Sequence, residues 1–247
     1  MTKYDTLSDD FYINVNLNTE MDLAPSRESV LHFFELLRKK YPSMAHFYTR
    51  ERGDFVLEED KESGAYRWAS IESRRISSGV VNPASIEAAL EQHEFVLDSM
   101  PAALSVSPLD CESLSFMAGF DYTYRGNQNH LIVEALGVPP AYERLLEIPG
   151  ANMLTYEPTL QFALDPECRM QCRVNVESRT SAFHIRSGEF PEEQLSVYVT
   201  TRRFGSLEVG ESFVTTCRQL QEMCFRIVDS YVVDNILVPL QQAISIH

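Results

Sequence analysis

Positive charge is scarce in this sequence. Lysine and arginine together number 21, against 36 aspartates and glutamates, which gives a formal net charge of −15. Proteins that bind nucleic acid gain much of their affinity by neutralising phosphates with basic side chains, so the sequence predicts no nucleic-acid partner. A surface of this charge favours solubility and a cationic or neutral partner, although it remains compatible with a local strip of basic residues.

Long hydrophobic runs are missing as well. No apolar stretch reaches the roughly 18 residues that a membrane-spanning helix needs, and residues 1–10 lack the apolar segment of a signal peptide. The sequence therefore predicts a cytoplasmic protein without a membrane partner. Hydrophobic residues still make up 44% of the chain, which is enough for a core and argues against a disordered chain.

Cysteine occurs five times, an odd number, and without a secretion signal this disfavours a disulfide framework. Cys168 and Cys172 have a spacing that a metal site could use, but no further pair of cysteines or histidines follows at the spacing of a zinc finger. We therefore expect no metal and no cofactor. Cys217 and Cys224 fall on one face of a predicted helix, where cysteine behaves as a small buried hydrophobe.

Motifs of known catalytic sites are also absent. The chain has no glycine-rich phosphate loop, no Gly-x-Ser-x-Gly turn, no His-Glu-x-x-His zinc motif and no aspartate-rich calcium loop. The six histidines are scattered. His93 lies on the apolar stripe of a predicted helix and is expected to be buried and structural. His184, on a predicted strand near Arg186, has no carboxylate partner in the sequence around it.

What the sequence does contain is alternation. Residues 11–17 alternate between apolar and polar side chains, which is typical of a half-buried strand. A helix follows with Ser26 as its predicted N-cap, and then four short strands. Asn82-Pro83 is predicted to begin a second helix, with the proline at its first position. The order of this first unit, residues 1–100, is β-α-β4-α.

The same order follows again after a predicted linker at residues 101–113. The second unit, residues 114–247, begins with a strand and a helical stretch that is broken at residues 137–140. Further strands follow, among them predicted strands at residues 152–156 and 195–204, the latter counted as an extra strand before the final helix. The sequence thus predicts one compact two-lobed α+β structure.

One offset relates the two units. Glu72 lies 105 residues before Glu177, and the same offset matches the inward residues Phe11, Ile13, Val15, Leu17, Ala69 and Ile71 with Phe116, Ala118, Phe120, Tyr122, Val174 and Val176. A slip of one residue would exchange the faces of a strand, so agreement in two strands is informative. We interpret it as a tandem duplication. The alternative is an ordinary α+β domain in which alternation recurs because all strands alternate.

Two known architectures have a similar order of elements. Two fused β-α-β4-α units resemble, in topology, the saddle fold of the TATA-binding protein, in which one curved antiparallel sheet carries helices on its convex side. The chain also resembles a sporadic bacterial family of two-lobed α+β proteins, whose members often carry a Gly-Leu-Arg-Tyr strand. Here that stretch is Gly119-Phe-Asp-Tyr122, with aspartate in place of arginine. The resemblance implies a curved sheet with helices on one face and no particular chemistry.

The sheet face opposite the helices is the candidate binding surface. Inward strand residues are needed for the core, so their neighbours form a polar face that includes the chain's single tryptophan. Tryptophan, tyrosine and arginine are enriched among the residues that anchor interfaces. The predicted binding residues are Tyr12, Asn14, Tyr66, Trp68, Glu72, Arg74, Asp121, Arg173, Asn175, Glu177 and Arg179. The alternative is a solvated sheet face with cross-strand Glu–Arg pairs.

These patterns favour a non-enzymatic binding or interaction protein that uses the open sheet face for a protein or a small polar ligand. The alternative is an enzyme with a dispersed active site at the junction of the two units. Residues 232–240 are too apolar to lie free in water, so we expect them to pack on the body of the protein or across a homodimer contact.

Overall fold

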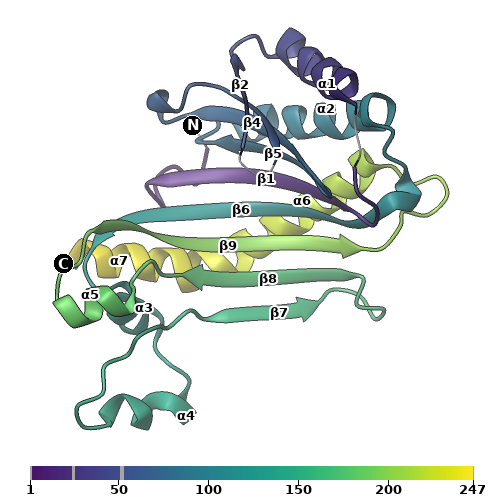
Figure 1. Ribbon diagram of the computed structural model, residues 1–247. Coiled ribbons are helices and arrows are strands. Elements are labelled where there is room, and N and C mark those ends of the chain that lie inside the picture. Colours follow the sequence, from purple (N-terminus) through teal and green to yellow (C-terminus); the bar gives the residue numbers. More distant parts are fainter. Residues whose placement is uncertain (1, 24–25, 51–52, 247) are drawn as a thin grey trace.

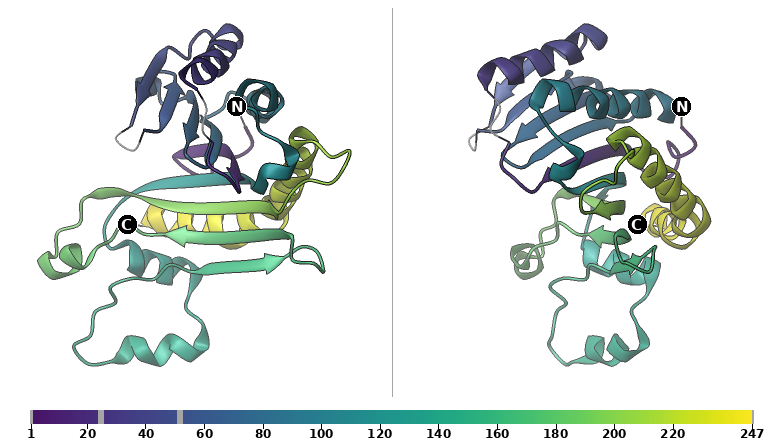
Figure 2. Two further views of the ribbon diagram at one scale, coloured as in Figure 1. Left: turned by 45° about the vertical axis from the view of Figure 1, so that its right-hand side comes forward. Right: turned by 90° about the vertical axis from the view of Figure 1, so that its right-hand side faces the viewer.

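The computed structural model describes residues 2–23, 26–50 and 53–246. They form an α+β fold in which nine strands build one curved antiparallel sheet, and the long helices lie along one face of it (Figures 1 and 2). The predicted fold class is therefore confirmed. In these ranges no helix is long and apolar enough to cross a membrane.

The strands occur in the order β2-β3-β4-β5-β1-β6-β9-β8-β7 across the sheet. Their bounds are β1 (Asp10–Thr19), β2 (His46–Thr49), β3 (Phe55–Glu58), β4 (Tyr66–Glu72), β5 (Arg75–Val81), β6 (Cys111–Arg125), β7 (Thr159–Ala163), β8 (Met170–Glu177) and β9 (Glu192–Phe204). The order is mirrored about the central pair β1–β6, except that the edge strand β2 has no counterpart among the described residues. We call β1 to β5 the first half of the sheet and β6 to β9 the second half.

The mirrored order is the order expected of two related units, but the offset of 105 does not hold in every strand. Across the sheet, the cross-strand partners run Val15–Ser78–Ala69 in the first half and Phe120–Val197–Val176 in the second. Ala69 therefore corresponds to Val176 and not to Val174, and Glu72 falls two residues away from Glu177 in this correspondence. A shift of two residues keeps every side chain on the same face of the sheet. The inward and outward positions of the two units therefore match under either offset.

Two predicted strands of the second unit are corrected. The strand counted as extra is β9, which pairs with β6 as β5 pairs with β1. Residues 152–156 form no strand. The Asn129 side chain binds the backbone there instead, donating to the carbonyl of Leu154 and accepting from the N–H of Tyr156. Those backbone groups are satisfied without a neighbouring strand.

The described residues form seven α-helices, and the long ones pack on one face of the sheet in two groups. Their bounds are α1 (Arg27–Lys40), α2 (Ile86–Leu104), α3 (Gln128–Leu136), α4 (Pro140–Glu143), α5 (Ala182–Ser187), α6 (Phe213–Ile227) and α7 (Val238–Ile246), with short 3-10 turns η1 (Lys61–Ser63), η2 (Pro108–Asp110) and η3 (Arg144–Glu147) and a π-helical segment η4 (Val228–Leu237). Helix α2 covers β5 and β1, with α1 packed against it, and α6 covers β6 and β9. The sheet face opposite α2 and α6 is called the open face below.

The core lies between the sheet and these helices. Phe11 and its alternate neighbours in β1 are buried, as are Phe116 and Phe120 in β6. The Tyr4 ring contacts those of Phe120 and Phe225 at centroid distances of 5.7 and 5.8 Å. The inward residues of the central strands are therefore committed to the core, and their neighbours are left for the open face.

Helix α2 differs from the prediction at both ends. It begins after Ser85, whose hydroxyl accepts from the N–H of Ala88, and not at Asn82-Pro83. The Asn82 side chain accepts instead from the N–H of Phe11 and so ties β5 to β1. At its other end α2 continues through Pro101 to Leu104 because Met100 and Leu104 are buried in the core. The segment predicted as a linker therefore contains the last turn of α2, η2 and the start of β6.

The C-terminal segment packs on the body of the protein, one of the two arrangements expected for it. Leu237 and Leu240 are fully buried, and the Tyr122 hydroxyl donates to the carbonyl of Leu237 at 3.3 Å. Helix α7 contacts α3. Not all of the segment is covered, however, because Asp234 and Asn235 are exposed.

Candidate functional site

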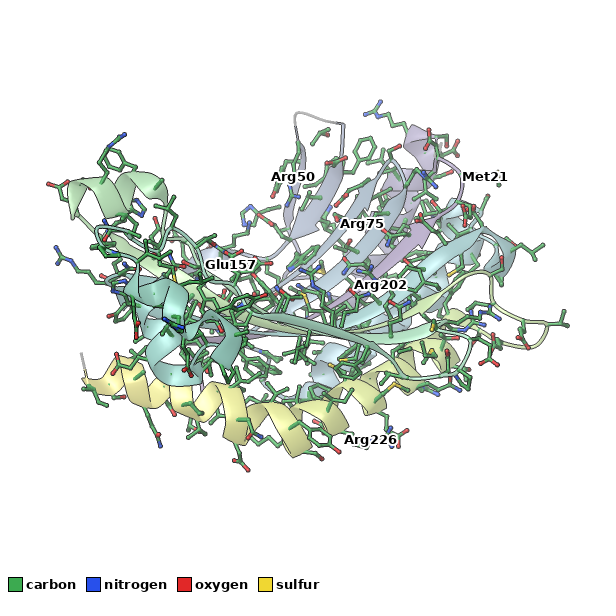
Figure 3. The ribbon with its side chains drawn as sticks, turned by 90° about the horizontal axis from the view of Figure 1, so that it is seen from below. Met21, Arg50, Arg75, Glu157, Arg202 and Arg226 are labelled. Atoms are coloured by element: carbon green, nitrogen blue, oxygen red, sulfur yellow. The ribbon has the colours of Figure 1, made fainter. Side chains whose placement is uncertain are left out.

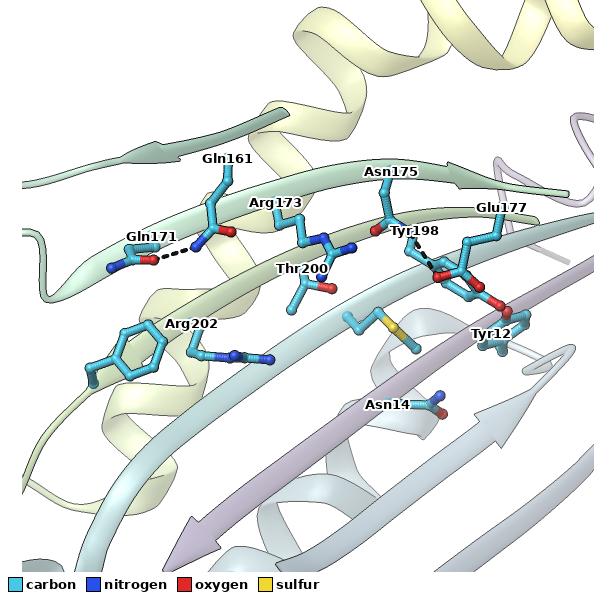
Figure 4. Close-up of a pocket in the computed structure, with 12 residues that line it drawn as sticks. Tyr12, Asn14, Gln161, Gln171, Arg173, Asn175, Glu177, Tyr198, Thr200 and Arg202 are labelled. Carbon is cyan, nitrogen blue, oxygen red and sulfur yellow. Dashed lines mark hydrogen bonds between the residues drawn. The ribbon is translucent and has the colours of Figure 1, made fainter. Parts of the chain in front are cut away.

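The open face of the second half holds a groove of about 470 Å³ (Figure 4). A volume of this size is typical of sites for small molecules. Strands β8 and β9 supply most of its wall, and β1, β6 and β7 complete it. Its lining residues are Tyr12, Asn14, Met117, Gln161, Gln171, Arg173, Asn175, Glu177, Tyr198, Thr200, Arg202 and Phe204. We call this hollow the open-face groove.

Strand register explains why these residues meet. In the second half, the cross-strand partners run Gln161–Arg173–Thr200–Met117 from β7 to β6. The same row continues into the first half through Asn14 and Gly79 to Trp68. Because side chains opposite each other in a sheet point to the same face, one row of side chains runs from the groove to Trp68.

Two arginines dominate the electrostatics of the groove. Arg173 is exposed and Arg202 is half-buried. Among the described residues neither forms an ion pair, and the buried Arg202 Nε has no hydrogen-bond partner there. Burial lowers the pKa of Arg202, and the positive charges of Arg75 and Arg173 lower it further, while only Glu112 acts in the opposite direction. Figure 3 shows Arg75 and Arg202 on the same side of the sheet, away from Arg226.

The end of the groove near β1 carries a hydrogen-bonded network. The Tyr12 hydroxyl donates to Asp121 at 3.1 Å, and the Tyr12 and Tyr198 rings lie edge to face at 6.3 Å. Burial raises the pKa of Asp121, and hydrogen bonds from Ser196 and Tyr12 partly offset that effect. Burial, with the Asp121 charge beside it, also raises the pKa of Tyr12. Tyr12 therefore stays protonated and acts as a hydrogen-bond donor at neutral pH.

Glu177, the acidic residue in the groove wall, is already engaged. Its carboxylate accepts from the Asn175 amide at 3.0 Å and pairs with the Arg179 guanidinium at 3.4 Å. Arg179 also donates to the Tyr198 hydroxyl at 3.4 Å. Glu177 is therefore not available to neutralise Arg173 and Arg202, and the middle of the groove keeps a positive charge.

Two glycines let aromatic rings lie flat against the open face. A Cβ atom on Gly79 would come within 2.2 Å of the Trp68 indole, and one on Gly119 would come within 2.3 Å of the Tyr12 ring. Each ring therefore covers the glycine directly opposite it on the neighbouring strand. Aromatic side chains across from sheet glycines replace the packing that the glycine lacks.

The structure brings together part of the predicted set. Tyr12, Asn14, Arg173, Asn175 and Glu177 line the open-face groove. Asp121 and Arg179 border it through the hydrogen bonds described above. Five of the eleven predicted residues therefore line one groove, and two more support its wall.

The four remaining predicted residues lie elsewhere. Trp68 and Tyr66 lie on β4 in the first half, and a lysine ammonium stacks on the Tyr66 ring at 5.6 Å. Glu72 pairs loosely with Arg75 at 3.9 Å. Arg74 is not part of the open face, because it lies in the turn after β4, where its guanidinium donates to the carbonyl of Thr19 at 3.0 Å and to that of Glu20. A turn residue does not follow the alternation of the strand before it.

Sequence reasoning missed much of the groove wall. Tyr198, Thr200, Arg202 and Phe204 come from β9, and Gln161 comes from β7. Part of the signal is present, because Leu195, Val197 and Val199 are apolar at alternate positions and are buried. Because the prediction counts this strand as extra, its outward residues are missing from the predicted face.

The candidate histidines and cysteines lie outside the groove. His93 is fully buried, as expected, and its ring bonds the Ser78 hydroxyl at 2.9 Å. His184 lies on the short helix α5 and not on a strand. Cys172 is buried, which raises its pKa to about 12, whereas Cys168 is exposed. Within the described ranges, no three histidine, cysteine or acidic side chains gather as metal ligands would.

Comparison of the chain with protein-family models, with curated proteins and with solved structures gave no match.

Proposed function

We propose that this protein is a cytoplasmic binding protein that holds a small polar ligand with an anionic group in the open-face groove, without catalysing a reaction. The observation that carries the proposal is the pair Arg173 and Arg202, two guanidinium groups that no carboxylate of the described residues pairs with, although the chain has a net charge of −15. The cytoplasmic location is supported by the five cysteines, all of which are free thiols.

Placing Arg173 and Arg202 side by side lowers the stability of the ligand-free protein. A half-buried guanidinium loses part of its hydration, and two neighbouring cations add repulsion to that loss. Acidic residues are abundant in this chain, yet none pairs with Arg173 or Arg202 among the described residues. Unfavourable charge placement of this kind is typical of functional sites. A carboxylate or phosphate group between the two guanidinium groups would offset both the lost hydration and the repulsion.

The rest of the wall indicates a polar ligand. Gln161 donates to Gln171 at 2.6 Å, and each amide keeps further donors or acceptors for a ligand. The Thr200 and Tyr198 hydroxyls add two more groups, while Met117 provides an apolar contact. The same anionic chemistry could be presented by a free metabolite or by a side chain of a partner protein. We still expect no binding to duplex nucleic acid, because the net negative charge repels its phosphates.

Thermal unfolding in the presence of anions tests the proposal. Citrate and pyrophosphate, each compared with sodium chloride at equal ionic strength, should raise the melting temperature saturably in the wild type. Arg202→Gln should abolish that rise and should leave the ligand-free protein as stable or more stable by about 0.5 kcal/mol, because a desolvated cation is removed. Arg38→Gln, at an exposed position of α1, is the matched control and should retain the rise.

The outcomes separate the sources of the anion. A saturable rise with citrate or pyrophosphate supports a free metabolite. A rise only with a phosphorylated or acidic peptide supports a partner protein. Equal behaviour of wild type, Arg202→Gln and Arg38→Gln under every anion would contradict the proposal.

A second candidate function is an enzyme with its active site at the junction of the two units. The observation that favours it is the Tyr12–Asp121 pair, which joins β1 to β6 and includes a carboxyl group of raised pKa. Mass spectrometry of a ligand that co-purifies with the protein tests this candidate. Conversion of that ligand by the wild type and not by Tyr12→Phe would favour an enzyme.

We also infer that the chain arose by tandem duplication, as in the TATA-binding-protein fold, and that it is related to the two-lobed bacterial family that it resembles. The mirrored strand order about β1–β6 supports this origin. The relation concerns ancestry and fold and assigns no ligand.

A further inference from the structure

A second hollow, of about 780 Å³, lies on the helix side of β7 and β8, where α6 and η4 leave these outer strands partly uncovered. Leu160 and Phe162 of β7 form one wall, and Tyr231 and Ile236 of η4 form the other. Leu160 is 72% exposed and Phe162 is 41% exposed. An apolar concavity left in contact with water usually marks an interface. We call this hollow the edge groove.

A separate segment carries the complementary apolar surface. Residues 137–158, which include α4 and η3 and are called the arm, project beyond the β7 edge of the sheet (Figures 1 and 2). Tyr142, Leu145, Leu146 and Ile148 of the arm are between 48% and 56% exposed. Four large apolar side chains on one short projecting segment cannot be covered by that segment alone.

The base of the arm is fixed. The Asn129 side chain of α3 holds the Leu154 carbonyl and the Tyr156 N–H at 3.1 and 3.0 Å, and the Tyr156 hydroxyl donates to the Gly137 carbonyl at 2.8 Å. These bonds tie both ends of the arm together at α3. In Figure 1 and in both views of Figure 2, the arm extends away from α6. The arm is therefore held clear of the edge groove of its own chain.

Charge is complementary between the arm and the edge groove. Arg226 of α6 lies in the groove wall, and the arm carries Glu143 and Glu147. Within the described part of the chain, none of these three side chains forms an ion pair. Two copies with a net charge of −15 repel each other in general, so a contact between them requires a local site of this kind.

The edge of the sheet adds a further contact surface. The N–H of Leu164 donates to the carbonyl of Met170, and the N–H of Val176 donates to the carbonyl of Pro158. The backbone N–H and C=O groups of the even-numbered residues of β7 therefore point towards β8. The backbone groups of Thr159, Gln161 and Ala163 therefore point away from the sheet, as those of any edge strand do at alternate residues. A strand edge without a lysine or an internal proline is open to another chain.

We propose that the edge groove receives the arm of a second copy of this chain, so that two copies exchange arms around a two-fold axis near β7. Leu145 and Leu146 of one copy fill the apolar groove of the other, with Glu143 or Glu147 next to Arg226. Ile236 in this contact belongs to the apolar C-terminal segment that the sequence predicts to pack on the body or at a homodimer interface. The contact is isologous, as two-fold dimers require.

Sedimentation equilibrium of the full-length protein tests the exchange. The wild type should be a dimer at micromolar concentration, and Leu145→Glu in the arm and Leu160→Glu in the groove should each be monomeric. Both positions are largely exposed in the single chain, so both variants should fold, which thermal melts verify. Leu109→Glu is the matched control, because Leu109 is 77% exposed and lies outside both features; it should remain a dimer.

Mixing the two monomeric variants makes the test specific. The Leu145→Glu chain keeps an intact groove, and the Leu160→Glu chain keeps an intact arm, so an equimolar mixture should form a heterodimer through one arm–groove contact. A monomeric wild type, or a dimer that both variants leave intact, would overturn the proposal. Variants that remain monomeric on mixing would also overturn arm exchange.

Discussion

The two halves of the sheet have the same strand order, apart from the edge strand β2, but cover their faces differently. In the first half, α1 and α2 cover the sheet face on the helix side. Beneath α2, the buried side chains of Gln92, His93 and Ser78 form a polar cluster that holds the strands. Gln92 in that cluster donates to the backbone carbonyls of Trp68 and Gly79, both at 3.2 Å. In the second half, all residues of β7 are exposed, and hollows lie on both sides of β7 and β8. The first half is therefore covered on its helix side, whereas the outer strands of the second half border hollows on both faces, which is where the proposed binding site lies.

The largest expected effect concerns His93 in the first half. Burial lowers its pKa to about 3, below its ordinary value of about 6.5. Below pH 6.5 His93 is therefore protonated in the unfolded chain but stays neutral in the folded protein. The free energy of unfolding should fall by about 1.4 kcal/mol for each pH unit below 6.5.

Urea denaturation at pH 7.5, 6.5 and 5.5 measures this fall. In His93→Gln the loss between pH 6.5 and pH 5.5 should largely disappear, although the variant is less stable at pH 7.5. The same slope in both proteins would show that His93 is not responsible and that the first half is not the acid-sensitive part.

An effect of similar size, but independent of pH, is expected at Gly79, also in the first half. An added methyl group would come within 2.2 Å of the Trp68 indole and 2.4 Å of the Asn14 amide oxygen. Gly79→Ala should therefore cost about 1–3 kcal/mol, as other overpacked sites do. Trp68→Ala alone should cost less than the 3–5 kcal/mol of a fully buried tryptophan.

A double-mutant cycle identifies the cause. In the background of Trp68→Ala, Gly79→Ala should lose most of its cost, because the indole is no longer in the way. The measurement is urea unfolding followed by circular dichroism, since Trp68 is the chain's single tryptophan. Additive costs would mean that the indole does not rest on Gly79.

The smallest stability effect is expected at the junction of the halves. Burial raises the pKa of Asp121 above its ordinary value, so its ionised form is disfavoured in the folded protein. Its stabilising contribution is present at low pH and is lost as the pH rises through the folded pKa. Asp121→Asn should therefore raise the free energy of unfolding at pH 7 by about 0.5–1 kcal/mol. The gain should shrink towards zero at pH 3, and a gain that is equal at both pH values would exclude this explanation.

The fold could be predicted from the sequence where alternation was long and regular. Phe11 to Leu17 in β1 gave the face of the central strand correctly, and the chain order of elements gave the fold class. The exact pairing could not be predicted, because a two-residue shift preserves the faces, and Ala69 was therefore matched with the wrong partner. Asn82 resembled a helix cap because asparagine bonds backbone N–H groups in either setting, and here it bonds that of Phe11.

The candidate site was predictable only in part. Tyr12 and Arg173 were assigned to the correct face, because strand alternation alone decides the face. The positive charge of the groove was not predictable from a net charge of −15. It depends on whether a carboxylate lies next to Arg173 and Arg202 in the folded protein. That information lies in the register of β8 and β9, which brings Arg202 beside Gln171 and leaves Glu177 to Arg179.

The central claim, that the second half binds an anion between two arginines, can be observed directly in the Nε–Hε nuclear magnetic resonance signals of the arginine side chains. Signals of Arg173 and Arg202 are assigned from the spectra of Arg173→Lys and Arg202→Lys. On titration with pyrophosphate at constant ionic strength, these two signals should shift and reach saturation. Those of Arg38 on α1 and of Arg218, which pairs with Glu94, should not. Uniform small shifts of all arginines, or none at Arg173 and Arg202, would contradict the account.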